Sequence, residues 1–67
     1  MLFRRLKGRN VIVNLTNGDG FSGTVLGGLF VLRLASVTFY PAGRREGDTL
    51  NGTVRVPARV VQWIQEA

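Results

Sequence analysis

Hydrophobic and polar residues alternate with a period of two along most of this chain, which is the pattern of half-buried β-strands. In the first such stretch Val11, Val13 and Leu15 share one face, and the residues between them share the other. Similar stretches follow, each separated from the last by turn-forming residues. The pattern predicts an all-β protein with five short strands between Val11 and Gln65.

Glycine marks the first two turns. Asn17-Gly18-Asp19-Gly20 is a strong hairpin signal, because asparagine and glycine tolerate positive φ. A second strand is predicted from Phe21 to Leu26, and Gly27-Gly28 forms the next turn. Gly23 lies inside the second strand, where a glycine predicts a sharp bend or a bulge.

The third predicted strand contains a change of phase. Its first apolar residues, from Phe30 to Leu34, alternate on one face, whereas Val37 and Phe39 fall one position out of step. A bulge or a break is therefore expected at Ala35-Ser36. The apolar stretch from Val25 to Leu32 contains two glycines and is interpreted as buried strands.

The C-terminal part is predicted from its turn residues. Residues 40 to 50 contain proline, glycine and charged residues, and are expected to form an exposed loop. Thr53 to Val56 is the fourth predicted strand, Pro57 to Arg59 a single tight turn, and Val60 to Gln65 the last strand.

A hydrophobic surface that needs a partner is predicted from composition. The chain has 67 residues, 45% of them hydrophobic, a mean hydropathy of +0.13, and neither cysteine nor histidine for a disulfide or a zinc site. We expect it to bury apolar surface in a homo-oligomer or a larger protein assembly. The candidate interface residues are Leu2, Phe3, Leu6, Phe30 and Trp63. A local apolar cap is the alternative for Phe3 and Leu6, and a position between core and rim is the alternative for Trp63.

Charge adds a second candidate surface. The formal net charge is +5 and the sequence pI is about 11.5. The candidate basic contact patch consists of Arg4, Arg5, Lys7, Arg9, Arg44 and Arg45. Such a surface favours nucleic acid, membrane headgroups or an acidic protein face, and a solvated, solubilising surface accounts for it equally.

No catalytic, cofactor-binding or metal-binding residues are predicted. A nucleophile–base pair of the usual kind needs histidine or cysteine, and the four acidic residues are spread along the chain. Glu46 and Asp48 lie beside Arg44 and Arg45, which makes them a poor cation site. We therefore expect no enzyme and no cofactor. No targeting segment or membrane span is found, so the expected location is the cytoplasm or a virion.

The order of these elements resembles the SH3/Sm-like small β-barrel. The resemblance covers Asn10 to Gln65: a strand, an Asn-Gly hairpin, Gly23-Thr24-Val25, a long third strand, and a proline-led corner before a valine-rich last strand. It implies a five-stranded barrel domain over residues 10–67, preceded at residues 1–9 by a basic N-terminal arm or short helix. The Sm family binds RNA through an Asp and an Asn after the second strand and an Arg-Gly before the last. These loops here read Leu26-Gly27-Gly28-Leu29-Phe30 and Val56-Pro57-Ala58-Arg59, without that Asp, Asn and Gly.

A second resemblance is to short proteins encoded among the virion genes of tailed bacteriophages. The matching stretches are Leu6 to Gly18 and Val56 to Gln65. It implies a non-enzymatic structural or adaptor module of a capsid, connector or tail. The alternative is a small Sm-like nucleic-acid-binding barrel whose basic arm contacts phosphates, although no motif indicates nucleic acid. Binding that weakens steeply with salt would favour the alternative.

Overall fold

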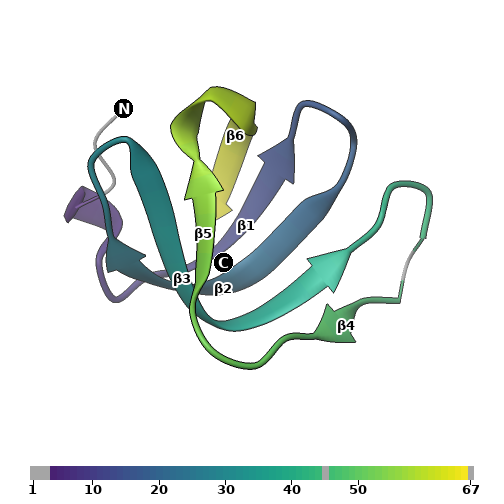
Figure 1. The fold of residues 1–67 in the computed structure, drawn as a ribbon, viewed down its shortest axis with the longest axis horizontal. Coiled ribbons are helices and arrows are strands. Elements are labelled where there is room, and N and C mark those ends of the chain that lie inside the picture. The colour runs from purple at the N-terminus through teal and green to yellow at the C-terminus, as the bar shows by residue number, and fades with distance from the viewer. Residues whose placement is uncertain (1–3, 45, 67) are drawn as a thin grey trace.

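The computed structural model describes residues 4–44 and 46–66, and its fold is all-β, as predicted (Figure 1). The elements in chain order are η1 (Arg4–Leu6), β1 (Asn10–Leu15), β2 (Gly20–Gly27), β3 (Val31–Tyr40), β4 (Asp48–Thr49), β5 (Val54–Pro57), η2 (Ala58–Val60) and β6 (Val61–Glu66). The described residues contain six strands rather than the five predicted, because the stretch expected to be an exposed loop contains the short strand β4.

All six strands belong to one antiparallel sheet with the order β4-β3-β2-β1-β6, and β5 also pairs with β3. Because β2 pairs along the length of β3, β4 and β5 share the other edge of β3. Phe39 pairs with Asp48 near one end of that edge, and Leu34 pairs with Val54 farther along. The Leu50 amide donates to the Val37 carbonyl between them (2.8 Å). Strands β4 and β5 are therefore two parts of one interrupted strand.

The sheet curves strongly but is not a closed ring of hydrogen bonds (Figure 1). Within residues 4–44 and 46–66 no strand pairing joins β5 to β6, and η2 connects them instead. Two backbone hydrogen bonds hold this corner: Ala58 donates to Phe30 (2.8 Å), and Thr16 donates to Val60 (3.0 Å). The predicted tight turn after Pro57 is present as this single turn of 3₁₀ helix.

The core forms on the concave face from the alternating apolar residues. Its buried members are Val11, Val13, Leu15, Val25, Leu32, Leu34, Val37, Val56 and Val61. The change of phase in β3 is confirmed, because Ser36 has a φ of +53° and the β2–β3 register shifts opposite it, between Ser22 and Thr24. An added Cβ at Gly23 would lie 2.9 Å from the Ala35 carbonyl oxygen, so glycine permits the close approach of the two strands.

The turn between β2 and β3 departs from prediction. The stretch Val25 to Leu32 was interpreted as buried, yet Leu26, Leu29, Phe30 and Val31 are exposed. A register shift between Val25 and Gly27 ends the regular ladder, and the turn carries the chain beyond the strands that cover the core. None of the helices in the described residues has the length and apolar character that a membrane span requires.

Candidate protein-docking surface

The predicted interface residues do not form one surface. Leu2 and Phe3 lie outside the described residues. Leu6 is partly buried and packs against the core, so it caps the sheet. Phe30 lies in the β2–β3 turn, and Trp63 lies on the outer face of β6. Among the predicted interface residues that the structure describes, Phe30 and Trp63 are the exposed ones.

The predicted basic patch is also divided. Arg5, Lys7 and Arg9 are exposed near η1, whose following residues are tied to β2 by the Gly8–Val25 hydrogen bond (2.8 Å). Arg44 is exposed in the turn after β3. The side chain of Arg4 is not described, and Arg45 lies outside the described residues.

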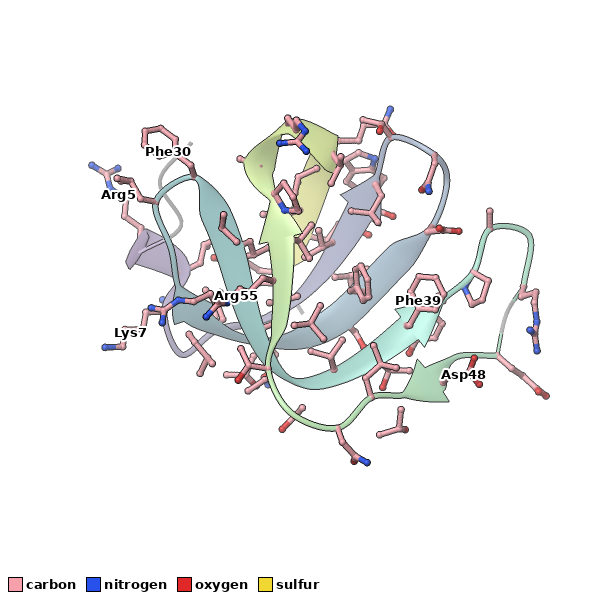
Figure 2. The ribbon with its side chains drawn as sticks, viewed as in Figure 1. Arg5, Lys7, Phe30, Phe39, Asp48 and Arg55 are labelled. Carbon is pink, nitrogen blue, oxygen red and sulfur yellow. The ribbon has the colours of Figure 1, made fainter. Side chains whose placement is uncertain are left out.

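Three consecutive exposed apolar residues lie at the β2–β3 turn. Leu29, Phe30 and Val31, called the apolar tip below, are 51%, 70% and 37% exposed. Figure 2 shows Phe30 projecting away from the sheet, on the side of the molecule that also carries Arg5 and Lys7. The Phe30 carbonyl accepts the hydrogen bond from Ala58, so the turn is anchored to η2 while its side chains face solvent. Exposed hydrophobic residues gathered in this way mark interaction sites more often than isolated ones do.

Two arginines lie directly beside the apolar tip. Arg33 on β3 and Arg55 on β5 are exposed cross-strand partners, called the arginine pair below. Together with the apolar tip and Gly28 they line a shallow hollow of about 450 Å³. One guanidinium nitrogen of Arg33 lies 3.5 Å from the position that a Cβ would take at Gly27, so this side chain extends across β2. Like charges directly opposite each other on a sheet are unfavourable.

None of the acidic residues in the described part of the chain lines this hollow. Asp19 is in the β1–β2 turn, where its carboxylate accepts hydrogen bonds from the Asn17 side chain and the Ala42 amide. Asp48 pairs with Phe39 at the far end of β3, on the opposite side of the view in Figure 2. Glu66 ends β6 beside the start of β1. The hollow therefore combines apolar side chains with positive charge.

A second, smaller apolar surface lies on the outer face of β1 and β6. Ile12 is 38% exposed and Trp63 is 49% exposed, on neighbouring strands. A hollow of about 340 Å³ begins at Ile12 and runs toward Ser36, lined mostly by small polar residues and backbone. Among the described residues no charged side chain lines this hollow, so it lacks the positive charge that the hollow at the β2–β3 turn has.

The described residues hold no group of three or more metal-ligating side chains. The sequence has no histidine or cysteine, and the described acids do not converge on either hollow.

Sequence reasoning missed most of the docking surface. Leu29 and Val31 were assigned to buried strands, and Arg33 and Arg55 were only placed in or beside strands. The glycine pair at 27–28 is a signal that could have predicted the exposure of Leu29 and Val31. Apolar residues at a tight turn extend past the sheet that would otherwise cover them. The pairing of Arg33 with Arg55 needs the register of β5, which local sequence does not contain.

A search of solved structures finds similar folds. A chain in the crystal structure of the NatC complex bound to CoA superposes with a TM-score of 0.74 and 28% sequence identity, over 88% of this chain and 75% of that chain. No family model and no curated protein matches the chain.

This similarity corrects the functional prediction. The prediction of a minor bacteriophage virion component is overturned, because the similar chain belongs to the NatC complex. The predicted assembly with partner proteins is consistent with a match inside a complex. Homo-oligomerisation stays a prediction.

Proposed function

We propose that this chain is a small accessory subunit of a multi-protein complex of the NatC kind, located in the cytoplasm. The observation that carries the proposal is the similarity, over most of both chains, to a chain of the NatC complex bound to CoA. The exposed apolar tip supports it, since a subunit that is always covered by a partner retains such a surface.

The SH3/Sm-like barrel is the finer description of the fold within this proposal. If β4 and β5 are counted as one interrupted strand, the described residues form five strands. Their order across the sheet is then fourth, third, second, first and last. The η2 corner then lies at the proline-led corner before the last strand, as the resemblance implies. A barrel of this size offers its turns and its outer faces to a partner.

The proposed subunit is not itself a catalyst. It has no histidine or cysteine to act as base or nucleophile, and its acids are dispersed. Any chemistry with CoA belongs, in this proposal, to a larger partner subunit. The role of this chain is to bind that partner and stabilise it.

Purification of the tagged chain from its own cells tests the proposal. We expect the chain to co-elute with a larger protein at constant stoichiometry in size-exclusion chromatography and native mass spectrometry. In isothermal titration calorimetry the complex should bind CoA, whereas the isolated chain should not.

Two results would contradict the proposal. One is a chain that remains monomeric, or associates only with copies of itself, at its cellular concentration. The other is saturable binding of CoA by the isolated chain, which would assign the ligand to this subunit.

A further inference from the structure

We propose that the apolar tip and the arginine pair together form the docking site for an acidic, amphipathic segment of a partner protein. Carboxylates of that segment pair with the two guanidinium groups, and its apolar side chains cover the tip. The inference rests on the proposed function. It adds which face of this chain binds the partner and which side chains of the partner contact that face.

The first step is the exposed apolar surface. Phe30 is 70% exposed and Leu29 is 51% exposed, although both belong to a turn whose backbone is held against η2. A small protein gains stability from burying such side chains, yet within residues 4–44 and 46–66 no strand covers these two. Because the backbone of this turn is already anchored, little backbone conformational entropy is lost when a partner covers these side chains.

The second step is the arginine pair. Arg33 and Arg55 face each other across the β3–β5 ladder, at the wall of the same hollow. Among the described residues that line the hollow there is no carboxylate, so a carboxylate from a partner would gain charge-assisted hydrogen bonds to either guanidinium group. Guanidinium groups bind carboxylates through two parallel hydrogen bonds, which fixes orientation as well as charge.

The third step is the character of the occupant. Two of the three residues in the tip are aliphatic, so the surface offers one ring, at Phe30, on which a base could stack. Nucleic acid on a small barrel is held by successive stacked bases and a basic groove. An aliphatic cluster bordered by two guanidinium groups fits leucine-like and glutamate-like side chains from one segment better.

The direct test uses the full chain and defined probes. The main probe is a short fluorescein-labelled peptide in which leucine and glutamate alternate in pairs. Matched peptides replace glutamate by glutamine or leucine by serine, and oligouridine of equal negative charge serves as the nucleic-acid probe. Fluorescence anisotropy gives each Kd, and NMR amide shifts of the labelled chain locate the site.

The expected result is saturable binding of the acidic leucine peptide, with amide shifts concentrated in residues 27–33 and at Arg55. Arg55→Gln or Phe30→Ser should raise the Kd by about tenfold. The matched controls are Arg44→Gln, which removes the same charge at the far end, and Trp63→Ser, which removes an exposed aromatic from another face. Both controls should leave the Kd within about twofold, as expected for residues outside the contact.

Three results would overturn the inference. They are the absence of saturable binding, an equal loss of affinity in the control variants, and tighter binding of oligouridine than of the peptide at the same amides. The last would assign the surface to nucleic acid.

The same variants in cells separate this inference from the proposed function. If the wild-type chain joins a complex and Arg55→Gln and Phe30→Ser join it equally well, the function stands and the docking site is wrong. If the wild-type chain joins no complex, the proposed function itself fails. Circular dichroism of each variant confirms that it is folded before either comparison is made.

Discussion

At the scale of single residues, the β2–β3 turn depends on Gly28. The φ of Gly28 is +135°, in a region that residues with a Cβ rarely adopt. An added Cβ would also overlap the carbonyl oxygen of Val31. Gly52 also has a positive φ (+81°), but a Cβ there would meet nothing within 4 Å. Comparing substitutions at Gly28 and Gly52 therefore separates the cost of backbone strain from the cost of steric overlap.

We predict that Gly28→Ala lowers the free energy of unfolding by about 3 kcal/mol or more, because strain and overlap add. Gly52→Ala should cost about 1 kcal/mol, from strain alone. Urea denaturation followed by circular dichroism measures both values. Equal losses of stability in the two variants would show that the β2–β3 turn adjusts to the added Cβ, so that steric overlap costs nothing beyond backbone strain.

A second residue, Asp19, links two turns that are far apart in sequence. Its carboxylate accepts the Ala42 amide hydrogen bond at 2.7 Å, and its own amide donates to the Asn17 side chain at 3.0 Å. The β1–β2 turn is thereby tied to the turn that follows β3.

Asp19→Ala is expected to reduce the free energy of unfolding by about 1–2 kcal/mol, because the Ala42 amide loses a charged acceptor. Asp48→Ala removes the same charge from an exposed position and should change it by less than about 0.5 kcal/mol. Thermal unfolding of both variants checks the difference. If Asp48→Ala is as destabilising, net charge rather than the hydrogen bond accounts for the effect.

At the scale of elements, β3 determines the arrangement of the molecule. It pairs with β2 along one edge and with β4 and β5 along the other. Its change of phase at Ser36 keeps apolar residues on the core side in both halves. Its register with β5 also places Arg33 opposite Arg55.

Replacing Arg55 by glutamate should stabilise the isolated chain by about 0.2–1 kcal/mol, since a like-charge pair becomes an opposite-charge pair. The gain should shrink in high salt, which screens exposed charges. Arg44→Glu makes the same change in net charge without a cross-strand arginine and is the control. Urea denaturation at low and high salt measures both variants. A loss of stability in Arg55→Glu would mean that the arginine pair is not repulsive.

At the scale of the whole molecule, stability depends on a small core. In the part of the chain that the structure describes, nine buried residues form it, and the 67-residue sequence has no cysteine for a disulfide. Domains of this size are marginal, with unfolding free energies of about 3–10 kcal/mol. Burial of the exposed tip by a partner would therefore add a useful share of stability.

Leu32 is fully buried, and Leu32→Ala should cost about 2–5 kcal/mol, enough to abolish cooperative unfolding in many domains of this size. Leu26→Ala, at a position that is 36% exposed, should cost less than about 1 kcal/mol. Urea denaturation of the isolated chain distinguishes them. Similar losses would mean that the core is not centred on β3.

The sequence by itself determined the features that depend on neighbouring residues. Alternation predicted most of the strands and grouped Val11, Val13 and Leu15 on one face, the Asn-Gly pair predicted the first hairpin, and the phase change predicted the irregularity at Ser36. Each follows from backbone geometry over a few residues, which adjacent side chains report directly.

Only the tertiary structure decided which residues form a surface. The exposure of the apolar tip, the pairing of β4 with β3, the Asp19–Ala42 hydrogen bond and the facing of Arg33 and Arg55 all depend on strand register. Register joins segments far apart in the chain, and the free energy that selects it comes from packing of the whole core. For this reason a local pattern that predicted strands correctly could not reveal the docking surface.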